Sequence, residues 1–160
     1  MFVLGVDPGL STTGYGLVEG TYPPKAHLAG VIRTDTELPL PQRLAELHRG
    51  LSEVIGDTHP DVIALETVFT NRNLQTAITV GRASGVALLA AAQANVSVFE
   101  YVPTAVKSAV TGDGSANKEQ VQRMVSRLLR LQEPPKPADV ADALAIALCH
   151  LRAAPLEAYR

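Results

Sequence analysis

The sequence predicts one α/β domain over residues 1–160, with a five-stranded mixed sheet covered by helices on both faces. Two observations lead to this prediction. Short apolar runs of strand length are interleaved with segments in which apolar residues recur at helical spacing. Three strand-like segments come first, and helices separate the later ones, which is the order of a mixed sheet. Apolar residues make up 46% of the chain, so a full core is expected at this length.

The first half of the chain is expected to form three strands and a helix. Residues 2–6 are an apolar run that ends at Asp7, and a turn follows. Residues 13–19 are a suitable hairpin partner, and residues 26–34 are the expected third strand. Apolar residues at helical spacing then predict a helix around residues 44–55, which ends before Pro60.

The second half is expected to alternate strands and helices. Residues 62–65 form a short, fully apolar run, as in a central strand covered on both faces. A long helix is expected from about 73 to 95, and a fifth strand over 96–101. Pro103 opens a short helix, and a final helix runs from about 138 to 152. Between these two helices, Asn117 and Gln120 form a capping-box pattern that predicts one more helix.

Composition limits the classes of function. Cys149 is the only cysteine, which excludes an internal disulfide and a cysteine-based zinc cluster. The longest candidate membrane span, residues 84–94, is too short, and the N-terminus lacks the features of a signal peptide. We therefore expect a cytoplasmic protein without membrane contact. The net charge of −2 does not favour nucleic-acid binding, but residues 103–130 are locally basic.

Carboxylates follow three of the predicted strands. Asp7 and Glu66 each end an apolar strand, and if these strands are parallel neighbours, both side chains emerge at the carboxyl edge of the sheet. That edge is where open α/β sheets place their functional sites. Glu100 ends the fifth strand in the same way and is a rival candidate. For each of these residues the alternative is that the carboxylate only marks where the strand leaves the core.

Two more carboxylates, Asp139 and Asp142, lie three residues apart at the start of the final helix. This spacing puts both on one helix face. Acidic residues at a helix N-terminus can simply complement its dipole, which is a sufficient explanation for Asp139. Asp142 is harder to explain in this way, because apolar residues surround it. A carboxylate cluster without cysteine or paired histidine favours Mg²⁺ or Mn²⁺, and two such ions can support phosphodiester cleavage.

Motifs along almost the whole chain, in order, resemble the RuvC Holliday-junction resolvases. Jointly they are highly specific, although none is specific alone. The motifs are Gly5-Val6-Asp7-Pro8-Gly9, Thr13-Gly14-Tyr15-Gly16, Ala64-Leu65-Glu66-Thr67-Val68-Phe69, Gly81-Arg82-Ala83-Ser84-Gly85-Val86, Val98-Phe99-Glu100-Tyr101, Lys107, Gly112-Asp113-Gly114-Ser115-Ala116-Asn117-Lys118 and Ala138-Asp139-Val140-Ala141-Asp142-Ala143-Leu144-Ala145.

The resemblance implies a ribonuclease H-like fold and a homodimeric, Mg²⁺-dependent endodeoxyribonuclease that resolves four-way DNA junctions by paired cuts. It places the four catalytic, metal-binding positions at Asp7, Glu66, Asp139 and Asp142. Each active site is expected to hold two Mg²⁺ ions, which Mn²⁺ can replace. Glu100 falls outside this quartet. The resemblance also suggests the RuvA–RuvB branch-migration machinery as a partner.

Other residues are candidates for DNA contacts. The resemblance places Phe69 at the distorted junction centre, where it could stack on a base, and places Lys107 and Lys118 against DNA. Arginines at helical spacing form a basic stripe that either neutralises phosphates or is an ordinary solvated face. The members of this stripe are Arg123, Arg127 and Arg130.

Small residues recur every fourth position on the long helix, at Ala77, Gly81 and Gly85. They allow close backbone approach, either to the sheet of the same chain or to a second protomer. The latter makes this helix our candidate for the dimer interface.

Three other functions compete with junction resolution. Asp7-Pro8-Gly9 with Thr12, Thr13 and Gly14 also resembles the phosphate-binding hairpin of actin-like ATPases and sugar kinases. That class needs two related domains around its nucleotide, and this chain is too short for both. A non-enzymatic relative should lack part of the carboxylate set. A related nuclease that acts on structured RNA is the third alternative.

Overall fold

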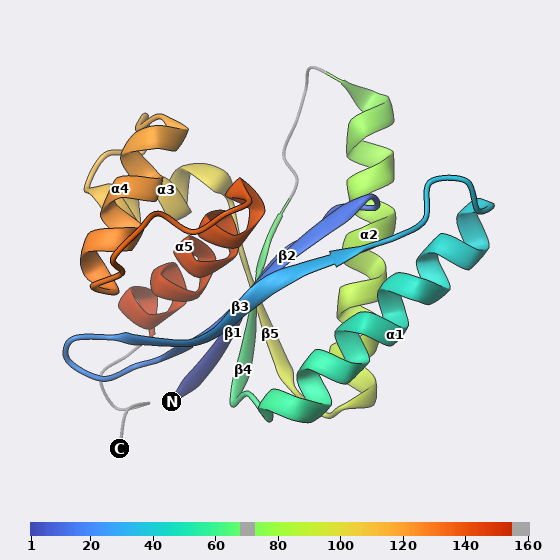
Figure 1. Ribbon diagram of the computed structural model, residues 1–160, viewed down its shortest axis with the longest axis horizontal. Coiled ribbons are helices and arrows are strands. Elements are labelled where there is room, and N and C mark those ends of the chain that lie inside the picture. The colour runs from blue at the N-terminus through green and yellow to red at the C-terminus, as the bar shows by residue number, and fades with distance from the viewer. Residues whose placement is uncertain (68–72, 155–160) are drawn as a thin grey trace.

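The computed structural model describes residues 1–67 and 73–154, which form one sheet between two helical layers (Figure 1). Phe69 lies outside the described residues. The strands are β1 (Phe2–Asp7), β2 (Thr12–Glu19), β3 (Lys25–Arg33), β4 (Val62–Glu66) and β5 (Ser97–Tyr101). The helices are α1 (Leu40–Thr58), α2 (Leu74–Gln93), α3 (Pro103–Thr111), α4 (Lys118–Leu128) and α5 (Ala138–Ala153). The α/β fold with a five-stranded mixed sheet is thus confirmed.

The sheet has the order β3-β2-β1-β4-β5. The first three strands pair antiparallel, whereas β1, β4 and β5 run parallel to one another. In the register of β1 with β4, Val6 is opposite Leu65, so the next residues, Asp7 and Glu66, leave the sheet side by side. The predicted parallel pairing of these two strands is therefore correct.

Each face of the sheet has its own hydrophobic core, because side chains alternate along every strand. Leu4, Val6 and Ile63 are buried against α1 and α2. Val3 and Ala64 are buried with α3, α4 and α5 on the other face. Figure 1 shows the two helical layers on opposite sides of the sheet, with α5 directly against it. Asp7 is in alternation with Val3, so it projects towards the α5 layer.

Helix α5 lies unusually close to β1 and β2, and glycines make this possible. Gly5 and Gly16 are opposite each other in the β1–β2 pair, and Gly14 is opposite Asp7. A Cβ atom on Gly5 would lie 2.0 Å from the carbonyl oxygen of Ala143, and one on Gly14 would lie 2.1 Å from that of Asp139. Real side chains do not allow such contacts. The glycines therefore let the helix backbone rest on the sheet, which brings its first turns to the end of β1.

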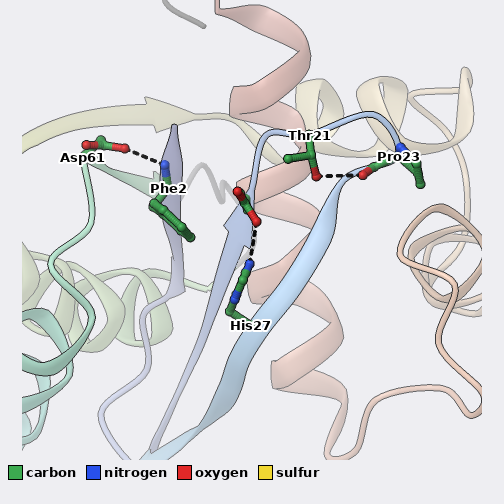
Figure 2. Close-up of polar contacts among 6 residues, drawn as sticks. Phe2, Thr21, Pro23, His27 and Asp61 are labelled. Carbon is green, nitrogen blue, oxygen red and sulfur yellow. Dashed lines mark hydrogen bonds and ion pairs between the residues drawn. The ribbon is translucent and has the colours of Figure 1, made fainter.

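The opposite end of the sheet is closed by short polar contacts (Figure 2). The Asp61 carboxylate accepts a hydrogen bond of 2.6 Å from the backbone amide of Phe2, which ties the start of β4 to the start of β1. His27 on β3 pairs with Glu19 on β2 at 2.8 Å, and Thr21 donates to the carbonyl of Pro23 across the hairpin. These contacts hold the strand ends that lie away from the carboxylates.

Helix α2 is long and apolar enough, by length and composition, to cross a membrane. The expectation that no segment would qualify considered only residues 84–94 and is wrong by this criterion. One such helix is weak evidence of a membrane, since core helices pass the same test. Here Ala83, Ala87 and Ala90 are buried against the rest of the fold, whereas Leu74 and Leu89 are exposed.

Candidate active site

Two carboxylates, Asp7 and Glu66, mark the carboxyl ends of neighbouring parallel strands. The strand pairing continues one step past Glu66, because the amide of Thr67 donates to the carbonyl of Tyr101 at 2.9 Å. Glu66 is also opposite Tyr101 in the β4–β5 register, so its backbone is held against β5. The two carboxylates therefore start from rigid strands rather than from loops.

The other two carboxylates come from the first turns of α5. Asp142 is flanked by Ala141 and Ala143, both fully buried, so its helix is locked against the sheet. The backbone of Asp139 lies over Gly14 on β2. The charges of both residues act on Asp7, and that of Asp142 also acts on Glu66. The structure thus places the other three carboxylates of the predicted quartet within electrostatic range of Asp7.

Burial and mutual repulsion raise the pKa values at this site. The pKa of Asp7 rises to about 7, first because of burial and then because of the negative charges of Glu66, Asp142 and Asp139. The pKa of Glu66 also rises to about 7, through burial and the charge of Asp142. Carboxylates that share a site bind a proton or a cation more tightly than isolated ones. The cluster is therefore electrostatically prepared for a positive ion.

Two lysines line the same cavity of about 310 Å³ as Asp7, Glu66 and Asp142. Lys107 lies on α3, and its charge acts against the raised pKa of Glu66. Lys118 is the first residue of α4, and its Nζ atom lies 3.0 Å from Oδ2 of Asp142. The predicted capping box fixes that helix start, because Asn117 and Gln120 exchange hydrogen bonds of 2.8 and 2.9 Å. Both lysines therefore lie beside the carboxylates, and their contact with DNA stays a prediction.

The turn between β1 and β2 is held by hydroxyl groups. Thr13, which is fully buried, donates to the carbonyl of Gly9 at 2.6 Å and accepts from the amide of Gly9 at 3.1 Å. The guanidinium of Arg43 on α1 reaches this region through hydrogen bonds to Thr34 and Ser11. The Thr13 hydroxyl is therefore engaged within the turn, which disfavours the phosphate-binding hairpin of the ATPase alternative.

One supporting pair was not foreseen from the sequence. His150, on α5, is 4% exposed, and its Nδ1 atom lies 2.7 Å from the hydroxyl of Tyr101. Its ring also stacks at a tilt on Phe99, with 4.9 Å between centroids. Burial lowers the pKa of His150, so it is more readily neutral than a free histidine. No sequence pattern indicated this pair, because its members are 49 residues apart.

Not every candidate belongs to the site. Glu100 is exposed, and it lies two residues after Val98 on β5, so both side chains point to the same face of the sheet. Val98 packs on the α1–α2 side, so Glu100 faces away from the other carboxylates. Arg123 and Arg127 are exposed on α4, and Arg123 pairs with Glu119 at 3.1 Å. The stripe does not extend to Arg130, because α4 ends at Leu128 and Arg130 has a positive φ of 52°. Helical spacing alone did not show where the helix stops.

The donor set of this site suits a hard divalent cation, since it consists of carboxylates, and burial and like charge raise the pKa values of Asp7 and Glu66. In the part of the chain that the structure describes, however, no three His, Cys, Asp or Glu side chains are close enough together to form a ready metal cage. In their present positions these carboxylates therefore do not form a complete metal site.

Comparison with known proteins places this geometry in a family. The sequence pattern of the family described as "Crossover junction endodeoxyribonuclease RuvC" matches residues 3–150. A protein of that name from Desulforamulus reducens is 50% identical over 153 residues, which cover 94% of this chain and 93% of its own.

Two solved structures agree. RuvC from Thermus thermophilus has a TM-score of 0.87 at 39% identity and covers 95% of this chain and 94% of its own. The T. thermophilus RuvC in complex with a Holliday junction substrate has a TM-score of 0.88 at 39% identity, over 94% of this chain and 92% of its own. The ribonuclease H-like fold expected from the sequence is confirmed by these matches.

Proposed function

The chain belongs to the RuvC family of crossover junction endodeoxyribonucleases, and we propose that it resolves four-way DNA junctions by metal-dependent hydrolysis. One observation of the structure carries the proposal: Asp7, Glu66 and Asp142 line a single cavity together with Lys107 and Lys118. Acidic groups for metal and basic groups for phosphate are thus present at one place. The similarity to a RuvC structure that contains a Holliday junction supports four-way DNA as the substrate.

Asp7, Glu66, Asp139 and Asp142 would hold the divalent ions, Mg²⁺ or Mn²⁺. Such ions lower the pKa of water and stabilise charge on phosphate oxygens. The lysines of the cavity would neutralise and position the DNA phosphate. The chain's own contribution is rigidity, because two of the carboxylates end strands and the other two lie on a helix packed directly on the sheet.

The first test compares a four-way DNA junction with a linear duplex of the same sequence, in Mg²⁺ and in EDTA. We expect cleavage of the junction only with metal, and little cleavage of the duplex. Asp7→Asn, Glu66→Gln, Asp139→Asn and Asp142→Asn should each abolish cleavage while junction binding remains. Glu100→Gln is the matched control, because it removes a carboxylate at the same sheet edge on the other face. A quartet variant with near-normal cleavage would remove that residue from the metal site.

We also propose that the enzyme is a homodimer that cuts two opposed strands. The described part of each chain has one such carboxylate cluster, and a two-fold dimer would present two of them to a two-fold symmetric junction. Gly81 and Gly85 on α2 are exposed, and an added Cβ would meet nothing within 4 Å, so packing within the chain does not explain them. Ala77 is half-buried on the same helix. We therefore keep the small residues of α2 as our candidate for the contact between the two protomers.

A cruciform in supercoiled plasmid DNA distinguishes paired from independent cutting. Two cuts in one binding event yield linear product directly, whereas separate nicks accumulate open circles first. Wild type should show the first pattern, and Gly81→Leu should weaken the dimer and show the second, with an unchanged circular dichroism spectrum. Wild-type protein that sediments as a monomer on the junction and passes only through open circles would contradict the dimer. Contact with a RuvA–RuvB machinery is a further proposal, testable by co-sedimentation on a junction.

A further inference from the structure

Among the residues that the structure describes, one cation touches the carboxylate cluster directly. The Nζ atom of Lys118 lies 3.0 Å from Oδ2 of Asp142, and the lysine side chain is 70% exposed while that of Asp142 is 20% exposed. Lys107 lines the same cavity, but among the described residues it makes no ion pair. The two lysines therefore differ: one holds a carboxylate, and the other acts on the cluster only through its field.

The parts that carry this ion pair are rigid, and its lysine is not. The Asn117–Gln120 capping box holds the backbone at Lys118, and buried neighbours hold the backbone at Asp142. The lysine side chain has a long flexible stem and is mostly in solvent. An exposed ion pair of this kind is weak and exchanges readily. Lys118 can thus leave Asp142 without any movement of the fold.

We propose that Lys118 competes with the divalent metal ion for Asp142, so that the lysine weakens metal binding as long as it stays on this carboxylate. The inference rests on the proposed function, in which Asp142 is a metal ligand. The competition has a physical basis, because one oxygen of Asp142 cannot accept a short hydrogen bond from an ammonium group and bind a metal ion at full strength. A DNA phosphate that draws the lysine away would relieve the competition.

Other charges support the assignment to Lys118. The hydrogen bond to Asp142 is the largest cause of the raised pKa of Lys118, and the charges of Asp7 and Asp139 add to it. The lysine is therefore held by the cluster as a whole, through the one carboxylate that it touches. A metal ion at the cluster would meet the same charges and would repel the ammonium group.

The test measures Mn²⁺ binding to the full chain without DNA, at pH 8, from the electron paramagnetic resonance signal of free Mn²⁺. Lys118→Gln should bind Mn²⁺ about fivefold more tightly than wild type, the upper range for an exposed pair. Lys107→Gln removes an equal charge from the same cavity without breaking an ion pair to a described residue, so it should have a smaller effect. Arg49→Gln, on α1 beyond the sheet, should have none.

The outcomes separate the two proposals. If Lys118→Gln binds Mn²⁺ no more tightly than Lys107→Gln, the lysine acts only through its field and the competition is wrong, while the metal site stands. If wild type and all variants fail to bind Mn²⁺, the metal site of the proposed function is wrong and the competition is wrong with it. Thermal unfolding of the metal-free variants checks that the Lys118 substitution leaves the fold intact.

Discussion

Two pairs of glycines in this chain have opposite surroundings. Gly5 and Gly14 lie under α5, where an added Cβ would come within 2.0 and 2.1 Å of backbone carbonyl oxygens. Gly81 and Gly85 lie on the exposed side of α2, where an added Cβ would meet nothing within 4 Å. The first pair is required by packing within the chain and the second is not. A glycine in a motif therefore indicates a close approach, but only the structure shows whether its partner is in the same chain.

The comparison also separates the two helical layers by role. The α5 layer gathers buried like charges and depends on a close contact to do so. On α2 the backbone at Gly81 and Gly85 makes no such close contact, and apolar side chains such as Leu74 and Leu89 are exposed. Substitutions at the first layer should therefore be costly, and equivalent ones at the second should be mild.

The largest effect is expected for Gly5→Ala. Its methyl group would collide with the carbonyl of Ala143 and lie 2.8 Å from the amide of Ala147, so α5 has to move off the sheet. We expect the free energy of unfolding to fall by about 3 kcal/mol or more, as for severe overpacking. Urea denaturation measures it. Gly56→Ala, at an open position on α1, is the control. Equal stability of the two variants would show that α5 is not held closely against β1.

A smaller effect, of opposite sign, is expected for Asp7→Asn in EDTA. The folded-state pKa of Asp7 is raised from 3.8 to about 7, so its contribution to stability is fully present below pH 3.8 and is lost as the pH rises to about 7. The amide cannot ionise and avoids this loss. The full pKa shift corresponds to about 4 kcal/mol, and because Asp7 is only half-buried we expect roughly half of it, so at pH 8 the variant should be more stable than wild type by about 2 kcal/mol. Below pH 4 the difference should vanish.

The pH series needs a carboxylate control away from the cluster. Glu100→Gln serves this purpose, because Glu100 is exposed and faces the other side of the sheet. It should leave the pH dependence of urea denaturation unchanged. If Asp7→Asn is instead less stable than wild type at pH 8, the ionised carboxylate of Asp7 stabilises the fold, and the expected repulsion from the neighbouring carboxylates is wrong.

The smallest effect is expected for Gly81→Ala. The added methyl group meets nothing, and alanine favours a helix over glycine by about 0.5–1 kcal/mol. At low protein concentration, urea denaturation should show a gain of this size. A loss that grows with protein concentration would instead mean that another molecule covers this face, as expected for a dimer contact. The same substitution thus distinguishes an open helix face from an interface.

Much of the fold could be predicted from the sequence because its signals are local. The capping box at Asn117, the helix end before Pro60 and the apolar strand before Glu66 depend on nearby residues only. The end of α4 was less accessible, since Arg130 continues the helical spacing although the chain has already turned to a positive φ. The membrane criterion at α2 was missed because the apolar window extends further than its alanine-rich centre.

The sequence by itself predicted which carboxylates form the metal site, because each stands at a strand end or on one helix face within a family motif. It could not determine the contacts between segments far apart in the chain. Only the tertiary structure placed Lys118 on Asp142, joined Tyr101 to His150 and turned Glu100 away from the cluster. The physical reason is that the first two relations depend on how α5 packs against its neighbours, and the third depends on which helices cover each face of β5. The close contact of α5 with β1 and β2 brings the charges of Asp139 and Asp142 near Asp7 and so helps to raise its pKa. The residues next to Asp7 in the sequence do not show this.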